Sequence, residues 1–155
     1  MRVAIASDHA GFALKNDLKR FLDELAVPYE DAGPDTVAAV DYPDSAAAVA
    51  RAVRAGHADR GILICGTGIG MSIAANKIPG IRAALATNAE MARLSRAHND
   101  ANVVTLGGRT TTPDQAREIV RLFLSTAFDG GRHQTRIAKI AQLESCPDST
   151  RTTPS

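Results

Sequence analysis

Residues 61–70 read Gly-Ile-Leu-Ile-Cys-Gly-Thr-Gly-Ile-Gly. The continuous apolar run from Ile62 to Ile64 is typical of a parallel strand that is buried on both faces of a sheet. Glycines at alternate positions then end the strand, and residues 71–78 predict a short helix. A buried strand that turns through glycines into a helix is the repeating unit of an α/β fold.

The same alternation of short apolar runs with amphipathic or alanine-rich segments extends along the rest of the chain. Strands are expected at residues 3–6, 27–31, 61–65, 82–87 and 102–106. Helices are expected at residues 12–25, 44–55, 71–78, 90–98, 112–127 and 132–143. This pattern predicts a doubly wound three-layer α/β/α sandwich around a five-stranded parallel sheet, in the flavodoxin-like strand order 2-1-3-4-5. We expect one domain over residues 1–143 and a disordered polar tail over residues 144–155.

The composition excludes several classes of protein. The chain has 155 residues, of which 45% are hydrophobic, and its net charge of +1 is too small for a disordered chain. Its 18 basic residues face 17 acidic ones, which argues against binding nucleic acid through phosphate charge. No apolar run approaches the ~20 residues of a membrane helix. The two cysteines fit neither a disulfide framework nor a paired zinc motif. We therefore expect a cytoplasmic protein.

The predicted strand order places a ligand site at one edge of the sheet. In open α/β sheets, ligands bind outside the carboxyl ends of the strands, at the point where the strand order reverses. In the order 2-1-3-4-5 this point lies between the first and third strands. The loops that follow those strands, residues 7–11 (Ser-Asp-His-Ala-Gly) and 65–70 (Cys-Gly-Thr-Gly-Ile-Gly), are therefore expected to form the site.

The glycine loop after the third strand has two interpretations. Gly66, Gly68 and Gly70 could serve only to allow a tight strand-to-helix turn. They could also let backbone N–H groups converge on an anion beside a helix N-terminus. Their spacing is that of neither a dinucleotide-binding fingerprint nor a Walker loop.

Three titratable residues are candidate catalytic groups, each with a structural alternative. Cys65 ends a buried strand, where it is either an inert core thiol or a thiolate that acts as a base or nucleophile. Asp8 follows the first strand and either caps the first helix or acts on a ligand. His98 closes the fourth predicted helix, where a histidine can also serve only as a partner of the helix dipole.

Three arginines are candidate anion contacts. Arg132 and Arg136 are four residues apart and share one helix face, and Arg109 follows the fifth strand. Guanidinium groups without interleaved acids suit a phosphate, and the alternative is a solvated surface stripe. The chain thus combines a thiol, a histidine, an aspartate, an amide-lined loop and arginines, with no metal-ligand cluster or cofactor motif in its sequence. That inventory suits a cofactor-free proton transfer on a small phosphorylated substrate.

Six motifs, in order along the chain, resemble those of the ribose-5-phosphate isomerase B family, which also holds the galactose-6-phosphate isomerase subunits. They are Ser-Asp-His-Ala-Gly at 7–11, Asp-Tyr-Pro at 41–43, Ile-Cys-Gly-Thr-Gly-Ile-Gly at 64–70, Ala-Ala-Asn-Lys at 74–77, His-Asn-Asp-Ala-Asn-Val at 98–103 and Gly-Gly-Arg-His-Gln at 130–134. The resemblance covers residues 1–143. It implies a homodimer or dimer of dimers with active sites at the subunit interface. It also implies interconversion of D-ribose 5-phosphate and D-ribulose 5-phosphate through a cis-enediol(ate), in the pentose phosphate pathway, without metal or organic cofactor.

The resemblance further implies a role for each candidate residue. Cys65 would be the base that moves the proton between C1 and C2. His98 would be the acid that helps to open the furanose ring, assisted by Asp8. The enediolate oxygen would be held by the loop residues Gly66, Thr67, Gly68, Ile69 and Gly70.

The remaining candidates would bind the sugar and its phosphate. Asn99 would hydrogen-bond sugar oxygens. His9, Arg132 and Arg136 would grip the phosphate, with Arg109 at the same end.

The resemblance leaves the substrate open. One branch of the family carries a glutamate base at the position of Met71 and lacks the cysteine, so the presence of Cys65 places this chain with the cysteine branch. The sugar could instead be an allose, galactose or tetrose phosphate, a choice that Tyr42 and residues 88–99 would decide. A non-catalytic sugar-phosphate-binding module on the same fold is the alternative from another class.

Overall fold

The computed structural model describes residues 1–145 and confirms the alternation of strands and helices. The strands are β1 (Val3–Ser7), β2 (Tyr29–Asp31), β3 (Arg60–Cys65), β4 (Ala83–Leu85) and β5 (Val103–Gly107). The helices are α1 (Phe12–Glu24), α2 (Tyr42–Arg54), α3 (Ile69–Ala75), α4 (Ala89–Asn99), α5 (Pro113–Ser125) and α6 (Arg132–Glu144).

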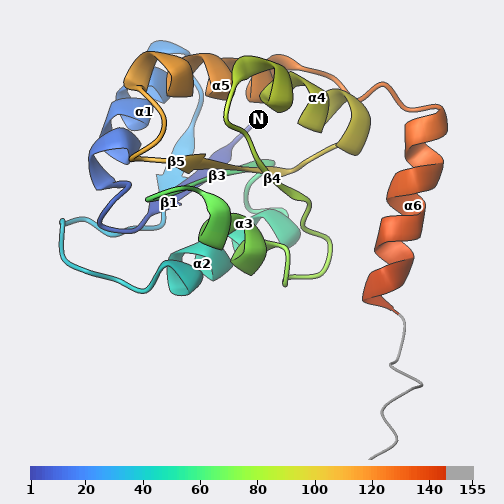
Figure 1. Cartoon of the computed structure of the whole chain (residues 1–155), viewed down its shortest axis with the longest axis horizontal. Helices are drawn as coiled ribbons and strands as arrows, with labels where there is room; N and C mark the ends of the chain where they lie inside the picture. Colours follow the sequence, from blue (N-terminus) through green and yellow to red (C-terminus); the bar gives the residue numbers. More distant parts are fainter. Residues whose placement is uncertain (146–155) are drawn as a thin grey trace, which may run out of the picture.

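The five strands form one parallel sheet in the order β2-β1-β3-β5-β4, with helices on both faces (Figure 1). The predicted α/β/α sandwich is confirmed, but the predicted order 2-1-3-4-5 is wrong in its last two positions. β5 pairs with β3, and β4 lies at the edge. β5 is buried along its whole length, whereas all three residues of β4 are half-buried. The longer apolar strand takes the interior place because an interior parallel strand is covered on both faces.

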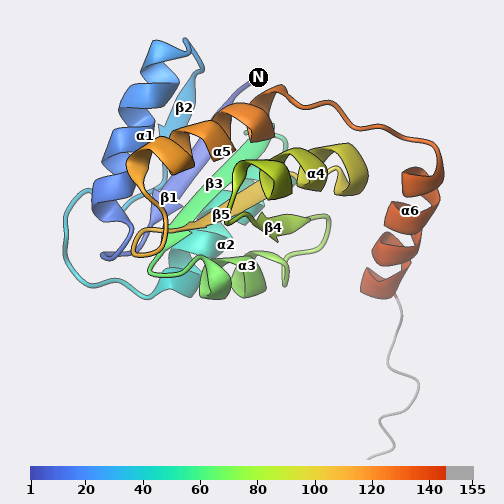
Figure 2. The same cartoon turned by 45° about the horizontal axis from the view of Figure 1, so that its top comes forward.

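The observed order also decides which helices share a face. Parallel crossovers are right-handed, so the step back from β4 to β5 puts α4 on the opposite face from α3. Helices α1, α4 and α5 accordingly cover one face of the sheet, and α2 and α3 cover the other (Figures 1 and 2). In the predicted order, α4 would have packed beside α3.

The core consists of one hydrophobic layer on each face of the sheet. Ile62 and Ile64 of β3 pack in the layer under α1, α4 and α5. Leu63 and Cys65 alternate with them and pack in the layer under α2 and α3. All four side chains are buried. Cys65 is therefore both a core residue and the last residue of the central strand.

Two predicted helix starts coincide with caps in the structure. The side chain of Asn88 accepts a hydrogen bond from the N–H of Met91 at the start of α4. Thr112 and Gln115 form a reciprocal capping box at the start of α5. These caps fix where α4 and α5 begin, and with them the positions of the loops that precede both helices.

Helix α6 stands to one side of the sandwich (Figure 2). Its last residue, Glu144, accepts hydrogen bonds from the N–H of Gly80 at 2.9 and 3.0 Å. Residue 144 thus belongs to a helix and not to the predicted tail, whose residues 146–155 lie outside the described part of the chain. Within residues 1–145, no helix has the length and apolar character needed to cross a bilayer.

Lys15 is completely buried beneath the loop that follows β2. Its Nζ donates to Asp31 Oδ1 at 2.8 Å and to the carbonyl oxygen of Pro34, and the more exposed Lys19 donates to Asp31 Oδ2 at 2.7 Å. Burial raises the pKa of Asp31, but the bonds from Lys15, Lys19 and the N–H of Gly33 outweigh it and hold the pKa below its ordinary value. The buried ion pair ties α1 to the end of β2.

Lys15→Met should lower the free energy of unfolding by about 3 kcal/mol at pH 7, because it leaves a mostly buried carboxylate short of its counter-charge. Lys19→Met removes a partly exposed partner of the same carboxylate and should cost less than about 1 kcal/mol. The pKa of Asp31 is lower in the folded chain than in the unfolded chain. The contacts of its carboxylate therefore stabilise the fold fully at a pH above the unfolded pKa. This stabilisation is lost as the pH falls through the folded pKa. The gap between the two variants should therefore narrow only as pH falls through the folded pKa of Asp31, which lies below its ordinary value of 3.8. Urea unfolding measures both, and equal costs at pH 7 would contradict the assignment.

Candidate active site

The loops that follow β1 and β3 meet at the carboxyl edge of the sheet, as the switch-point argument predicts. β1 and β3 are hydrogen-bonded neighbours, and the loops after them line one open depression of about 460 Å³. Its lining residues are Asp8, Tyr42, Cys65, Gly66, Thr67, Ile69, Gly70, Ile73 and Arg109. Asp8 and Cys65 thus lie together as predicted, whereas Arg109, expected at the same end as Arg132 and Arg136, lines this depression instead.

Cys65 lines this depression from the end of β3. The side chain is 6% exposed, and the backbone N–H of Gly68 donates to Sγ at 3.2 Å. An N–H donor strengthens its bond when the sulfur becomes anionic. The sulfur of Cys65 thus accepts a backbone N–H at the point where the buried strand ends.

The turn around Cys65 depends on close backbone packing against the loop after β5. The N–H of Gly108 donates to the carbonyl oxygen of Cys65 at 2.7 Å, and the N–H of Arg109 donates to that of Gly66 at 3.0 Å. Gly68 has a φ of +80°, and a Cβ there would lie 2.9 Å from the backbone carbon of Leu106. Glycine is needed at this position for both its conformation and its size.

Asp8 does not cap α1, whose N-cap is Gly11 with no side-chain cap hydrogen bond. Its side chain is buried, and Oδ1 accepts the N–H of Gly11 at 3.0 Å, which shapes the turn before α1. It also lines the depression with Cys65. His9, the next residue, is exposed. Nearby, Thr67 is exposed and its Oγ1 accepts the N–H of Ile69 at 3.3 Å.

Two lining residues, Tyr42 and Ile73, are absent from the predicted site residues. Tyr42 begins α2, and its ring lies so close to Gly70 that a Cβ there would be 2.7 Å from a ring carbon. Ile73 lies one turn after Ile69 on α3, and both are more than half exposed. In the sequence, the Asp-Tyr-Pro motif at 41–43 indicates that Tyr42 belongs to the site. Ile73 looks like an ordinary helix residue in the sequence, and only the packing of α3 brings it to the depression.

The other predicted residues lie elsewhere in the same chain. Helices of an α/β sheet run antiparallel to the strands, so the end of α4 lies at the amino edge of the sheet. His98 and Asn99 occupy that end, shortly before β5 begins. Arg132 and Arg136 lie on the first turns of α6. The segment before α6 is held against the end of α4 by a 2.9 Å hydrogen bond from the N–H of Asp129 to the carbonyl oxygen of Ala97.

The predicted residues thus fall into two groups. The carboxyl-edge group contains Asp8, His9, Cys65, Gly66, Thr67, Gly68, Ile69, Gly70 and Arg109. The amino-edge group contains His98, Asn99, Arg132 and Arg136. One chain does not bring the two groups together, since they lie at opposite edges of its sheet.

Side chains that the sequence did not single out surround His98. Its ring stacks on that of His133, with centroids 4.3 Å apart and planes within 10°. Burial lowers the pKa of His133, and the charges of His98, Arg132 and Arg136 lower it further. The neutral imidazole of His133 is therefore favoured beside a set of cationic groups.

A buried arginine fixes the end of α4. Arg96 is 4% exposed, and its Nη1 donates to Asp100 Oδ1 and to the carbonyl oxygen of Ala101, both at 2.7 Å. Arg82 donates to the carbonyl oxygens of Asn99 and Asp100 from the other side. Asp100 itself has a positive φ of 45°, which ends the helix. These bonds hold His98 and Asn99 at a defined place on the amino edge.

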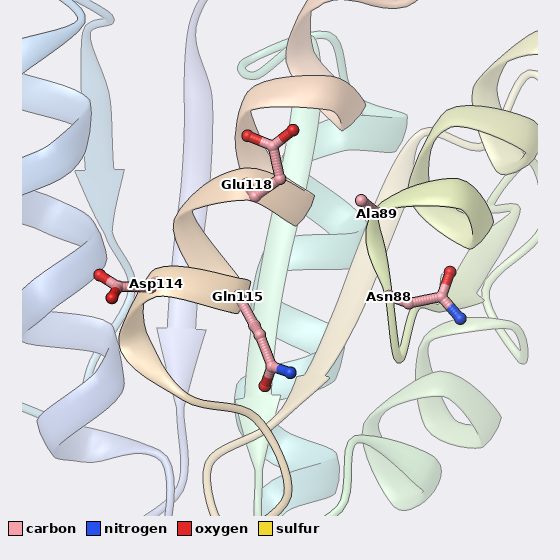
Figure 3. Close-up of a pocket in the computed structure, with 5 residues that line it drawn as sticks. All are labelled: Asn88, Ala89, Asp114, Gln115 and Glu118. Atoms are coloured by element: carbon pink, nitrogen blue, oxygen red, sulfur yellow. The ribbon is translucent and has the colours of Figure 1, made fainter.

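A second depression lies between the start of α4 and α5 (Figure 3). It is lined by Asn88, Ala89, Asp114, Gln115 and Glu118. Two carboxylates would repel a phosphate, so this depression is a poor candidate for a phosphorylated ligand. The depression beside Cys65, with the Arg109 guanidinium, is the better one.

A doubly wound α/β fold with a thiol and an amide-rich turn at its switch point belongs to the class of small-molecule-binding α/β proteins. The family described as ribose/galactose isomerase matches residues 3–140. A putative sugar phosphate isomerase of Bacillus subtilis, YwlF, is 54% identical over 145 residues, which cover 93% of this chain and 97% of the relative.

Solved structures agree with this match. Ribose-5-phosphate isomerase B of Clostridium thermocellum superposes with a TM-score of 0.92 at 51% identity, over 94% of this chain and 98% of the other. The Mycoplasma genitalium enzyme with bound ribulose 5-phosphate gives a TM-score of 0.90 at 43% identity, over 94% and 97%. The chain belongs to the ribose/galactose isomerase family.

Gly68→Ala should destabilise the fold by clearly more than Gly80→Ala. Both glycines have a φ near +80°, but a Cβ on Gly68 meets Leu85 at 2.7 Å and the Leu106 backbone, whereas a Cβ on Gly80 meets nothing within 4 Å. Gly80→Ala should cost about 1–2 kcal/mol, the price of a left-handed L-residue, and Gly68→Ala should exceed it by at least about 1 kcal/mol. Denaturant unfolding of both variants measures the difference, and equal costs would refute the close-packing argument.

Proposed function

We propose that this chain is an aldose–ketose isomerase that interconverts D-ribose 5-phosphate and D-ribulose 5-phosphate by proton transfer through a cis-enediol(ate). The observation that carries the proposal is the Cys65 sulfur at the switch point, beside Asp8, in a chain of the ribose/galactose isomerase family. The solved relative with bound ribulose 5-phosphate supports this choice of sugar. The reaction belongs to the pentose phosphate pathway.

Cys65 is the base in this proposal. Its thiolate takes the proton from C2 of the open-chain aldose and returns it to C1 of the enediolate, while one proton passes from the C2 oxygen to the C1 oxygen. The 3.2 Å bond from the Gly68 N–H supports the anionic sulfur before the proton arrives. The negative charge that then develops on the sugar oxygen is held by Thr67 and by backbone N–H groups of residues 66–70 other than those of Gly68 and Ile69, which donate to Cys65 Sγ and Thr67 Oγ1. The burial of Cys65 makes these interactions stronger than they would be in water.

The ring-opening step and the grip on the phosphate need the amino-edge group. His98 gives a proton to the ring oxygen of the furanose, with Asp8 assisting, and Asn99 hydrogen-bonds the sugar hydroxyls. Arg132 and Arg136 bind the phosphate together with His9 and Arg109. Guanidinium groups suit this task because they present paired donors to phosphate oxygens.

We infer that the working form is a homodimer, or a dimer of dimers, in which each site takes its carboxyl-edge group from one chain and its amino-edge group from another. Two observations support this inference. The two groups lie at opposite edges of the sheet within a chain. Large apolar side chains near both groups are substantially exposed, among them Ile69 and Ile73 on α3 and Ile140 on α6, as expected of surfaces that pack against a second copy.

Other phosphorylated sugars remain the alternative within the same class. Allose 6-phosphate, galactose 6-phosphate and a tetrose phosphate differ from ribose 5-phosphate in length, and Tyr42 and Ile73 are placed to limit that length. Relative kcat/KM values across these sugars decide the question. A binding module without turnover is disfavoured, because it has no need of a thiol beside Asp8. The cytoplasmic location stays a prediction.

Cys65→Ala should abolish the formation of ribulose 5-phosphate from ribose 5-phosphate, because it removes the thiolate that moves the proton in this proposal. Turnover by the parent protein should survive EDTA. The loss on removing a base is expected to be at least about 10²–10⁴-fold. The control is Cys146→Ala, which changes the cysteine outside the described residues and should keep full activity.

Circular dichroism and thermal unfolding should show a folded Cys65→Ala protein. Undiminished turnover in this variant would remove Cys65 from the mechanism. No turnover by the parent protein on ribose 5-phosphate would redirect the search to allose 6-phosphate and a four-carbon sugar phosphate.

Mixing two inactive variants tests the shared site. When equal amounts of Cys65→Ala and His98→Asn chains are dissociated and reassociated, half of the dimers are mixed, and one of the two sites in each mixed dimer holds both intact groups. About one quarter of the parent activity should return. Cys65→Ala mixed with Asp8→Asn should recover none, because both changes lie in the carboxyl-edge group. Full activity in a monomer, measured by sedimentation and assay together, would overturn the shared site.

A further inference from the structure

Three potential metal ligands converge beside α4, outside the depression that holds Cys65. One ligand atom from each of His98, Asp129 and His133 lies within 4.8 Å of the others. They come from three separate places in the chain: the end of α4, the connection between α5 and α6, and the first turn of α6. The sequence gives no sign of this cluster, because its members are spread over 36 positions with no metal-motif spacing.

We propose that His98, Asp129 and His133 form a Zn²⁺ site, and that zinc bound there inhibits the protein. Two imidazoles and a carboxylate are a ligand set that zinc uses in open sites, where water completes a tetrahedron. Imidazole ligands favour Zn²⁺ over Mg²⁺ or Ca²⁺, which prefer sites made only of oxygen.

Side-chain rotation is needed for the three residues to hold the ion. Ligand bonds of ~2.0–2.1 Å place two atoms of a tetrahedral zinc site about 3.4 Å apart. Atoms that lie within 4.8 Å of one another can reach this separation through side-chain rotation. Asp129 is exposed and His98 is half-buried, so both can rotate. His133 is buried and its ring stacks face to face on that of His98, so the His98 ring must turn out of the parallel stack before both nitrogen lone pairs point at one ion.

The backbone holds the three ligands at fixed relative positions. The N–H of Asp129 donates to the carbonyl oxygen of Ala97, the residue before His98, at 2.9 Å. The N–H of His133 donates to the carbonyl oxygen of Gly130 at 3.1 Å, which closes the turn between Asp129 and α6. The backbones of Asp129 and His133 are therefore held next to the end of α4, which carries His98. Metal binding then costs little conformational entropy of the backbone.

The surrounding charges set a moderate affinity. Arg132 and Arg136 on α6 are close enough to affect His133 and repel a cation. On α4, Glu90 and Arg93 neutralise each other through a bidentate pair. Asp129 is thus the anionic ligand that offsets the charge of the ion, and its removal should affect binding strongly.

Bound zinc would act as an inhibitor by two routes. It would occupy the imidazole that opens the sugar ring, and it would draw Asp129 and His133 together beside the arginines that bind the phosphate. This inhibitory part rests on the proposed isomerase function, in which His98 is the acid. The binding part does not, because it requires only the three ligands.

Zinc binding is tested first on Cys65→Ala/Cys146→Ser protein, where neither thiol can bind the metal. Competition with a chromophoric chelator should show one Zn²⁺ per chain. Adding Asp129→Asn or His133→Gln to this background should each weaken binding by about 10-fold or more. Adding Asp114→Asn, which removes an exposed carboxylate from the depression between α4 and α5, should change nothing. Co²⁺ bound to the same protein should show visible bands of a site without sulfur.

Inhibition is tested next on chains that keep both cysteines. The parent protein should lose turnover as Zn²⁺ is added and recover it with EDTA. Asp129→Asn should match the parent in EDTA and need about 10-fold more Zn²⁺ for the same inhibition. The Asp114→Asn control should be inhibited like the parent.

Two results would overturn the inference. One is zinc affinity that is unchanged by Asp129→Asn and by His133→Gln. The other is zinc binding that disappears when the cysteines are replaced, which would assign the metal to a thiolate. If the parent protein proves inactive on every sugar phosphate, the proposed function fails, while the chelator competition still decides whether the zinc site exists.

Discussion

The site depends on the packing of β3 between β1 and β5, with its last residue facing a turn that only a glycine can make. The carbonyl oxygens of Cys65 and Gly66 accept N–H groups from the loop after β5, and Gly68 returns its own N–H to the Cys65 sulfur. The same bonds therefore position both the Cys65 thiol and the backbone N–H groups of the glycine loop. Because Asp8 follows the neighbouring strand, its position beside the thiol is set by the same sheet register.

The direction of the helices has an equally strong consequence. Helices that return the chain between parallel strands must run antiparallel to them, so a residue at a helix end lies at the amino edge while one at a strand end lies at the carboxyl edge. His98 and Cys65 are separated by this rule alone. The Arg96–Asp100 bond and the Asp129–Ala97 backbone bond then make the amino edge rigid enough to present His98, His133 and the α6 arginines as a unit.

Most of the fold was predictable from short-range patterns. The apolar runs and helical periodicity located every strand and helix of residues 1–145, to within a few residues at their ends. The order of the last two strands was not predictable in this way, because both segments read as apolar runs and nothing local says which one pairs with β3. The outcome was decided by burial on two faces, which favours β5, and by the right-handed crossover that carries α4 to the face of α1.

Residue types and strand ends, taken from the sequence alone, determined the chemistry at the switch point: a thiol, an aspartate and an amide-rich glycine loop at one edge of the sheet. These features are local, since each follows directly from a strand and its adjoining turn. The tertiary structure alone decided which residues share an edge, that Ile73 completes the depression, and that Asp129 and His133 lie beside His98. These contacts join segments far apart in the chain, and their geometry is set by sheet order, helix direction and side-chain packing.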